Sequence, residues 1–350
     1  MLVSFIIPAY NAADTIVRCL ESIYGLSLKQ DEFEVIVIDD ASSDNTVEVI
    51  EHYCQKGKSE ELRGKCENLI LLKQATNNRQ GAARNRGVKV AKGEYICFVD
   101  ADDVVTGGVV AAIMLAKETQ TDMTAYHCAN VNEHGRIICE KEHLGFEDDE
   151  VFSGMALQNR HPFWFSGPVA YVYSRTFLER VNYPFAEGVL YEDSDFVIVH
   201  LYFAHRMTYS GELGYKAYYR DGSTTHHTSF KNVADYLLLG VRMLRFYERI
   251  RSEGVNELSN DHDKFAEGIL EGACWNVAKS CKRLMRLQGS EDVRAFYDRI
   301  DSNINRMELS VDKNIQKYYW TAWMSICLKH KHVAIALLAV LIPIFKLTRR

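Results

Sequence analysis

The chain has 350 residues, of which 47% are hydrophobic and 25% are charged, which is the balance of an ordinary globular enzyme. Seven of its basic residues and none of its acidic residues follow Asp312, so residues 1–312 carry a formal charge of −13 and the tail carries +7. The acidic main body argues against a nucleic acid partner, and nine scattered cysteines without zinc-type spacing favour a reducing cytoplasm.

The first hundred residues alternate between patterns typical of strands and of helices. Pro8 is expected to end the first strand, and Asp14 is expected to cap the first helix. We expect strands over residues 3–7, 33–38, 69–72 and 95–99, with helices after the first two strands and from 81 to about 91. This alternation predicts βαβ units and a parallel sheet, whose ligands lie beyond the carboxyl ends of the strands.

The patterns after residue 104 are more varied. A helix and a strand region (122–131) are expected first, then an aromatic-rich stretch over 161–173 that leads to a helix over about 174–181. A further helix is expected from the acidic cluster at Glu192 to about residue 204. Because no proline stands between Pro184 and Pro343, and the sequence is amphipathic from residue 233, the C-terminal third is predicted to be mostly helical.

An apolar strand ends abruptly in three carboxylates, in the sequence Phe-Val-Asp-Ala-Asp-Asp over residues 98–103. Charges at the end of a buried strand need a cation or hydrogen bonds, because unpaired charges are costly to desolvate. Mg²⁺ or Mn²⁺ carrying a nucleotide diphosphate would meet that need, since these ions bind through a few carboxylates and phosphates. The alternative is a solvated turn that caps the next helix.

Six segments in this order resemble the family 2 glycosyltransferases. They are 4–11 (SFIIPAYN), 34–46 (EVIVIDDASSDNT), 81–87 (GAARNRG), 93–103 (GEYICFVDADD), 185–196 (FAEGVLYEDSDF) and 218–223 (YYRDGS). Each motif alone is weak, but the ordered set is specific, and it covers roughly residues 2–230.

The resemblance implies an α/β protein of the GT-A fold, a Rossmann-like, mostly parallel sheet flanked by helices, with a helical C-terminal extension. The catalytic domain would span residues 1–230, with a nucleotide-binding half (about 1–103) and an acceptor half (about 104–230). Residues 231–350 would form the helical C-terminal region.

The resemblance also assigns nucleotide-binding residues. The loop after the first strand would hold the base and ribose, Asp39 would accept a hydrogen bond from the uracil ring with Asp40 beside it, Arg84 would point into the nucleotide site, and Arg220 would clamp the diphosphate. The loop residues are Pro8, Ala9, Tyr10 and Asn11. Turn and cap chemistry is the alternative for Asp40, Ser42 and Asp44, and a solvated helix face is the alternative for Arg86.

In the family pattern Asp102 is the direct ligand of a divalent metal, Mn²⁺ or Mg²⁺. Asp100 would lie near the ribose or a water on the metal, and His226 or His227 would complete the metal shell. The alternative for Asp103 is a cap on the following helix.

The second acidic cluster resembles the segment that carries the catalytic base. The resemblance implies that Asp193 takes the proton of the acceptor hydroxyl and that Glu192 binds the acceptor. Asp195 competes with Asp193, and an acidic helix N-terminus favoured by the helix dipole would explain the cluster equally well in isolation. Trp164 and Phe165 would stack on a sugar of the acceptor or pack in the core.

The predicted function is a metal-dependent, inverting transfer of a sugar from a nucleoside diphosphate donor to a hydroxyl of a glycan or lipid-linked glycan, in bacterial surface polysaccharide synthesis. A UDP-linked donor is expected. The alternatives are transfer to a polyprenyl phosphate and an inactive glycan-binding protein. A nucleotidyltransferase or a dinucleotide oxidoreductase would need a glycine-rich loop where this chain reads Pro-Ala-Tyr-Asn.

The C-terminal tail (about 313–350) predicts contact with a membrane. Thirteen uncharged residues (333–345, VAIALLAVLIPIF) are flanked by lysines and arginines. A spanning helix needs about 20 apolar residues, so peripheral association with the anionic cytoplasmic face of the inner membrane is expected. Packing as a core helix is the alternative.

Overall fold

The computed structural model describes residues 1–56, 66–140, 144–147, 150–161, 167–219, 230–253, 264–266 and 268–269. The chain divides into two compact units, Met1–Ser223 and Thr224–Arg350. In the second unit the structure describes the 24-residue helix α8 (Phe230–Glu253). The predicted membrane-contacting tail lies outside the described residues and stays a prediction. Among the helices that the structure does describe, none has the length and apolar character needed to cross a bilayer.

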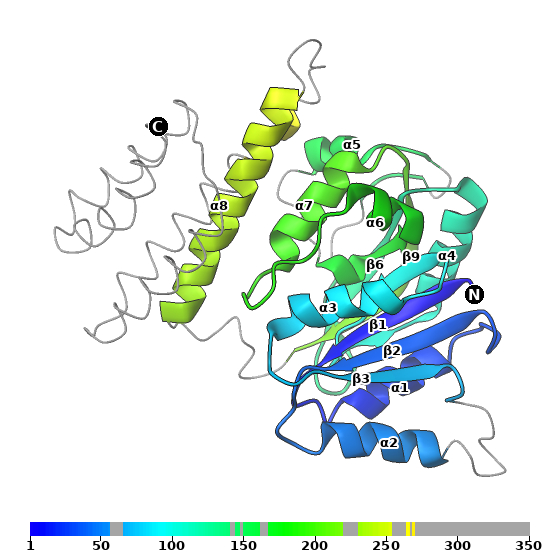
Figure 1. Cartoon of the computed structure of the whole chain (residues 1–350). Coiled ribbons are helices and arrows are strands. Elements are labelled where there is room, and N and C mark those ends of the chain that lie inside the picture. The colour runs from blue at the N-terminus through cyan, green and yellow to red at the C-terminus, as the bar shows by residue number, and fades with distance from the viewer. Residues whose placement is uncertain are drawn as a thin grey trace. The chain divides into compact units, whose positions relative to one another are not determined.

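The first unit is a single nine-stranded sheet with helices on both faces (Figure 1). Its elements follow one another as β1 (Val3–Ala9), α1 (Ile16–Tyr24), β2 (Phe33–Asp39), α2 (Thr46–Lys56), β3 (Leu69–Lys73), α3 (Arg79–Val90), β4 (Tyr95–Phe98), β5 (Val104–Val105), α4 (Gly107–Thr119), β6 (Met123–Val131), β7 (Ile137–Glu140), α5 (Gly154–Arg160), the 3-10 helix η1 (Pro168–Ala170), β8 (Tyr171–Ser174), α6 (Arg175–Val181), α7 (Asp193–Phe203) and β9 (Met207–Tyr218).

The sheet has the strand order β3-β2-β1-β4-β8-β6-β9-β5, and β7 pairs with β6. The first four strands of this order are parallel, as their βαβ pattern predicts. β8 then runs antiparallel to both β4 and β6, while β6 and β9 are parallel. The predicted α/β class with a GT-A-like curled sheet is confirmed, and the antiparallel pairs belong to its second half.

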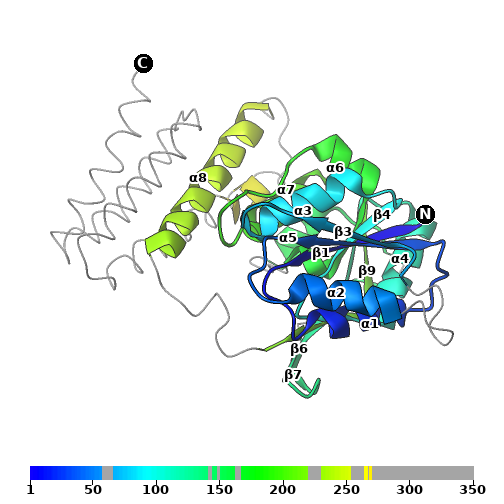
Figure 2. The same cartoon turned by 60° about the horizontal axis from the view of Figure 1, so that its bottom comes forward.

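Two helices cover one face of the parallel half and one helix covers the other. Figure 1 and Figure 2 both show α1 and α2 on one side of β1, β2 and β3, with α3 on the opposite side. Every residue of β1 and β2 is buried, which is the pattern of strands covered on both faces. In the second half, α4 packs against β6 and β9.

Two boundary predictions are wrong. Pro8 does not end the first strand, because β1 continues to Ala9 and pairs with β2 as far as Asp39. β4 ends at Phe98, opposite Ile6, so the N–H that Pro8 lacks removes no hydrogen bond with β4. Asp14 is not the helix cap either, since the N-cap position of α1 is Thr15.

Candidate active site

The loops that follow β1 and β2 are joined by hydrogen bonds from one asparagine. The backbone N–H of Asn11 donates to Oγ of Ser42 at 3.0 Å, and Oδ1 of Asn11 accepts from the backbone N–H of Ser43 at 2.8 Å. Asn11 has a φ of 50°, a left-handed conformation that asparagine tolerates better than most residues. Beside it the ring of Tyr10 is 49% exposed. The loop predicted to bind a base and ribose is therefore fixed in shape and open to solvent.

Asp39 and Asp40 both lie buried at the end of β2, but they face different partners. In the described part of the chain, the carboxylate of Asp39 accepts long hydrogen bonds, 3.3 and 3.4 Å, from the backbone N–H of Ser42. Oδ1 of Asp40 accepts from Nε2 of Gln74 at 2.7 Å and from the backbone N–H of Asn78 at 2.8 Å. Burial raises the pKa of Asp40, and these hydrogen bonds act against that rise. Asp40 thus anchors the start of α3, whereas nucleotide binding by Asp39 stays a prediction.

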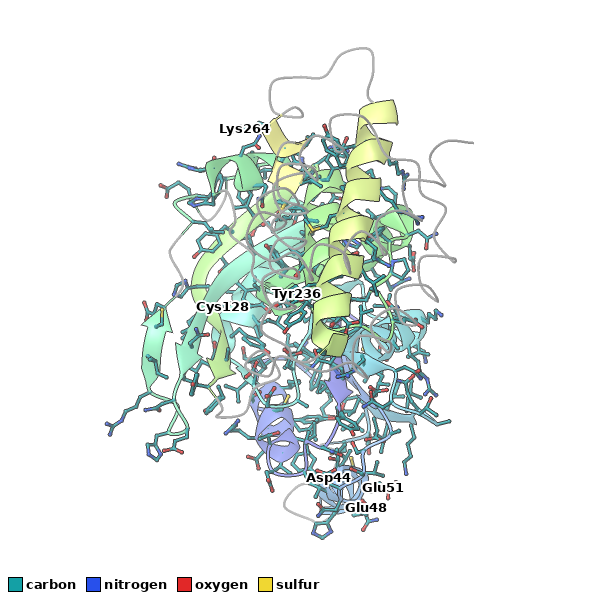
Figure 3. The ribbon with its side chains drawn as sticks, turned by 90° about the vertical axis from the view of Figure 1, so that its left-hand side faces the viewer. Asp44, Glu48, Glu51, Cys128, Tyr236 and Lys264 are labelled. Carbon is teal, nitrogen blue, oxygen red and sulfur yellow. The ribbon has the colours of Figure 1, made fainter. Side chains whose placement is uncertain are left out.

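Asp44 also connects the loop after β1 to the loop after β2. Its carboxylate accepts from the backbone N–H of Thr46 at 3.0 Å and from the backbone N–H of Ala13 at 3.2 Å. Its slight burial acts to raise its pKa, but the hydrogen bonds from Thr46 and Ala13 outweigh this and lower it. Figure 3 labels Asp44 in the same region as Glu48 and Glu51 of α2. The turn and cap chemistry considered for Asp44 is what the structure shows.

The Asp-Ala-Asp-Asp loop after β4 is held from two sides. On one side, Nη2 of Arg18 donates to the backbone oxygen of Asp102 at 2.6 Å, and the guanidinium lies 3.6 Å from the ring centre of Tyr218. On the other side, the hydroxyl of Tyr215 donates to Oδ2 of Asp103 at 2.7 Å. The loop therefore has little freedom to move its carboxylates.

Asp103 does not cap the following helix, because the N-cap of α4 is Thr106. It instead joins β5 to β9, since its second carboxylate oxygen accepts from the backbone N–H of Tyr218 at 2.8 Å. Burial, followed by the nearby charges of Asp100 and Asp102, raises the pKa of Asp103 to about 8. Negative charge is concentrated in this loop, which is a setting that suits a divalent cation.

Arg84 connects this loop to the second acidic cluster. Its side chain is 3% exposed. Nη2 of Arg84 donates to Oδ1 of Asp100 at 2.8 Å, and Nη1 donates to Oε1 of Glu192 at 2.6 Å. Burial acts to lower the pKa of Arg84, but these two carboxylates outweigh it and raise the pKa. One guanidinium thus spans two motifs that are 92 positions apart, and its predicted direct contact with a nucleotide stays a prediction.

Glu192 and Asp193 stand at the beginning of α7 in a buried setting. Tyr191, just before them, has a φ of 64°, which is uncommon for a bulky residue and is typical of functional sites. Burial raises the pKa of Glu192 to about 7 although Arg84 opposes this rise. Burial also raises the pKa of Asp193, which senses the charges of Arg84 and Asp100. Asp193 therefore lies within the same charge cluster as the Asp-Ala-Asp-Asp loop.

Asp195 and Asp193 face different neighbours. Its Oδ2 accepts from the hydroxyl of Tyr183 at 2.7 Å, and the residue is fully buried. By contrast, a Cβ placed on Gly167 would lie 3.6 Å from Oδ2 of Asp193, in ordinary contact with it. The carboxylate of Asp193 thus faces the start of η1, next to the predicted aromatic stretch, and Asp195 faces the chain before α7.

Three predicted site residues, Trp164, Arg220 and His226, lie outside the described residues, as do Phe165 and His227. Within the described ranges, no group of three or more His, Cys, Asp or Glu side chains is placed to hold a metal. A divalent ion that also binds phosphates needs only one or two carboxylates. Asp100 and Asp102 supply such hard oxygen donors, so the residues present fit Mn²⁺ or Mg²⁺.

Sequence reasoning did not identify the residues that hold these motifs in place. Arg18, Tyr215 and Tyr218 fix the Asp-Ala-Asp-Asp loop. The sequence shows Arg18 and Tyr215 only as ordinary helix and strand residues, and Tyr218 only as the first residue of the 218–223 segment. The small residues that begin α3 were a usable signal, because they indicate close approach of another segment.

Residues 4–165 match the family described as Glycosyl transferase family 2. The chain is 33% identical over 137 residues to a poly(ribitol-phosphate) beta-glucosyltransferase of Bacillus spizizenii, a match that covers 39% of this chain and 20% of that relative. It is 26% identical over 349 residues to the uncharacterized glycosyltransferase YibD of Escherichia coli, covering 94% of this chain and 95% of that protein. This chain therefore spans a fifth of the first relative and nearly all of the second.

Two solved structures share the fold. The crystal structure of S. aureus TarS in complex with UDP-GlcNAc has a TM-score of 0.58 and 22% sequence identity, and the match covers 93% of this chain and 80% of that chain. The mannosyltransferase PcManGT from Pyrobaculum calidifontis, in complex with GDP-Man and Mn²⁺, has a TM-score of 0.51 and 14% identity, with coverage of 98% and 86%. At these identities the likeness shows the fold alone.

Proposed function

We propose that this chain, whose residues 4–165 match the family described as Glycosyl transferase family 2, is a metal-dependent, inverting glycosyltransferase. The donor would be a nucleoside diphosphate sugar, most simply UDP-linked, and the acceptor a hydroxyl of a glycan or lipid-linked glycan. The observation that supports this is the buried Arg84, which holds Asp100 at 2.8 Å and Glu192 at 2.6 Å. It holds Asp100, proposed to lie near the donor ribose or a water on the metal, close to Glu192, proposed to bind the acceptor.

In the proposed reaction Asp193 accepts the proton of the acceptor hydroxyl. The oxygen then forms a bond to the anomeric carbon, and the bond from that carbon to the diphosphate breaks. A carboxylate with a raised pKa suits this role, because a base is most effective when its pKa lies near the working pH. Glu192, held by Arg84, would orient the acceptor beside Asp193.

The departing diphosphate carries negative charge into a loop that already contains three carboxylates. A divalent ion bound by Asp102, with Asp100 nearby, would supply the charge stabilisation that the leaving group needs. Two observations support the donor class. A fold neighbour is described with UDP-GlcNAc and another with GDP-Man and Mn²⁺.

A donor panel tests this proposal most directly. Purified full-length protein would be given UDP- and GDP-sugars with and without Mn²⁺, and release of the nucleoside diphosphate would be measured. We expect Mn²⁺-dependent release from one UDP-sugar. Release from no donor would contradict the enzyme assignment, and undiminished release in the presence of a chelator would contradict the metal.

Asp102→Ala tests whether Asp102 binds the metal that donor binding is proposed to require. Because it removes the proposed metal ligand, calorimetry should detect no Mn²⁺-dependent binding of UDP. Glu48→Ala, an exposed carboxylate on α2, is the control that should bind UDP like the parent. Unchanged UDP affinity of Asp102→Ala in Mn²⁺ would place the metal elsewhere.

A further inference from the structure

One face of α3 contacts the loop before α7 at residues 185–187 and at Glu192. Gly81, Arg84 and Asn85 lie three and four residues apart, so they share a helix face. Arg84 holds the end of the loop through Glu192, as described above. The other two residues contact the beginning of the same loop, which enters α7 at Asp193.

Asn85 binds the loop with both ends of its amide group. Its Nδ2 donates to the backbone oxygen of Phe185 at 3.0 Å and to Oε1 of Glu187 at 2.9 Å, and its Oδ1 accepts from the backbone N–H of Phe185 at 2.9 Å. Asn85 is buried, with 8% of its surface exposed. Only an amide offers a donor and an acceptor in this arrangement, so neither aspartate nor leucine can replace it.

Gly81 brings the two backbones close together. A Cβ at this position would lie 2.3 Å from the backbone oxygen of Ala186 and 3.0 Å from Cγ of Glu192. The N–H of Gly188 also donates to the backbone oxygen of Asn78 at 2.9 Å. The loop therefore rests on α3 at three successive points before it reaches Glu192.

Aromatic packing of Phe185 also holds the loop in place. The ring of Phe185 stacks on Phe196 of α7 with 3.6 Å between ring centres, and the guanidinium of Arg84 lies 5.3 Å from the ring of Phe185. Asn85 of α3 binds the backbone of Phe185, and Phe196 of α7 packs on its ring, so Phe185 connects the two helices. A shift of Phe185 would move the start of α7.

From this geometry we propose that Asn85 is a positioning residue for the proposed reaction. It fixes residues 185–187 so that α7 presents Asp193 to the acceptor at the correct place relative to the donor loop. This inference rests on the proposed function, since positioning is meaningful only for the transfer step. Asn85 contacts neither the Asp-Ala-Asp-Asp loop nor Asp193 through any hydrogen bond in the described part of the chain, so it would act on turnover and not on donor binding.

The test variant is Asn85→Asp, which keeps the acceptor for the N–H of Phe185 but sets an oxygen against the Phe185 carbonyl and the Glu187 carboxylate. We expect kcat for sugar transfer to fall about 10- to 100-fold, the size of effect that small misplacements of reacting groups produce. The affinity for UDP with Mn²⁺ should stay within about twofold, because the donor loop is untouched. Lys89→Ala, on the exposed end of α3, is the matched control and should leave both quantities unchanged.

Glu187→Gln provides a rescue experiment. In the double variant Asn85→Asp with Glu187→Gln, the side-chain amide introduced by Glu187→Gln can donate to the carboxylate introduced by Asn85→Asp. We therefore expect kcat to recover at least part of the loss. Glu187→Gln alone should lower kcat little. The inference is overturned if Asn85→Asp keeps full kcat, if UDP affinity falls in parallel with kcat, or if the double variant recovers nothing.

Hydrogen exchange separates a failure of this inference from a failure of the proposed function. In Asn85→Ala the N–H of Phe185 loses its acceptor, so peptides covering residues 185–193 should exchange faster than in the parent and in Lys89→Ala. A parent protein that transfers no sugar contradicts the proposed function, and faster exchange in Asn85→Ala would still show that Asn85 holds residues 185–187 in place. Unchanged exchange would show that Asn85 does not hold this loop, whatever the activity.

Discussion

The acidic residues that follow β2 and those that begin α7 are both held firmly, but by different groups. Asp40 and Asp44 bind backbone N–H groups of neighbouring loops, and the hydrogen bonds of Asp44 lower its pKa. Glu192 is paired with a buried guanidinium, and burial raises its pKa to about 7. Hydrogen bonds from backbone N–H groups favour the ionised form of a carboxylate and shape a loop, although burial still raises the pKa of Asp40, whereas desolvated carboxylates near a buried cation are suited to proton transfer.

Asp193→Asn, in the cluster at the start of α7, should have the largest effect on activity. Replacing the proposed base removes its proton-accepting oxygen, so transfer should fall by about 10²- to 10⁴-fold, with UDP binding close to that of the parent. Initial rates and calorimetry measure the two effects. Asp195→Asn is the matched comparison, since its side chain can still accept from Tyr183. If Asp195→Asn is the inactive variant and Asp193→Asn is active, the base stands two residues later than proposed.

Arg84→Met should destabilise the fold by about 3 kcal/mol above pH 7, because it leaves Asp100 and Glu192 without their buried partner. The pKa of Glu192 in the folded protein, about 7, exceeds its ordinary value of 4.5, so its ionisation lowers stability as pH rises through 7. Protonated Glu192 does not need the guanidinium, so the loss should shrink towards pH 5. Urea unfolding at pH 5 and pH 8 measures this difference.

Arg86→Met is the control for that experiment, since Arg86 lies on the same helix and its Nη1 donates to the backbone oxygen of Lys73 at 2.8 Å near the surface. It should change the unfolding free energy by about 0.5 kcal/mol or less at both pH values. A pH-independent loss in Arg84→Met would show that Glu192 does not titrate near neutrality.

Gly81→Ala should cost about 1–3 kcal/mol, because its methyl group would overlap the backbone oxygen of Ala186. Alanine otherwise favours helices by up to about 1 kcal/mol over glycine, so Gly107→Ala, with no atom within 4 Å of the added Cβ, should be neutral or stabilising. Thermal unfolding of the two variants gives the comparison. Equal stability would mean that α3 and the loop before α7 are not in close contact.

Asp44→Ala should have the smallest effect, at most about 1 kcal/mol at neutral pH, comparable to the loss of a helix cap and weakened by solvent. The folded-state pKa of Asp44 is lowered, so its contribution is present above its ordinary pKa and is lost as pH falls through the lowered value. The difference between variant and parent should therefore vanish in acid, opposite to the trend for Arg84→Met. A difference that persists at pH 2 would assign the effect to packing.

Local sequence patterns are sufficient to predict the parallel half of the fold and the positions of both acidic clusters along the chain. Continuous apolar runs at 33–38 and 95–99 and the helical patterns between them specify βαβ units, because these signals are local and periodic. Strands β8 and β9 were not predicted. β8 lies in an aromatic-rich stretch and β9 contains irregular pairing with β6, so both are defined by partners far along the chain.

The partners of the polar residues depend on long-range packing. Motif order suggested Arg84 as a candidate site residue, but it could not show that Arg84 pairs with Asp100 and Glu192. Spacing likewise could not show that Asp195, and not Asp193, accepts from Tyr183. Asn85 and Gly81 read locally as a polar residue and a small residue in a helix. Their contacts are made with a loop about a hundred residues later, and such contacts depend on how α3 and α7 pack on the shared sheet, which no local pattern encodes.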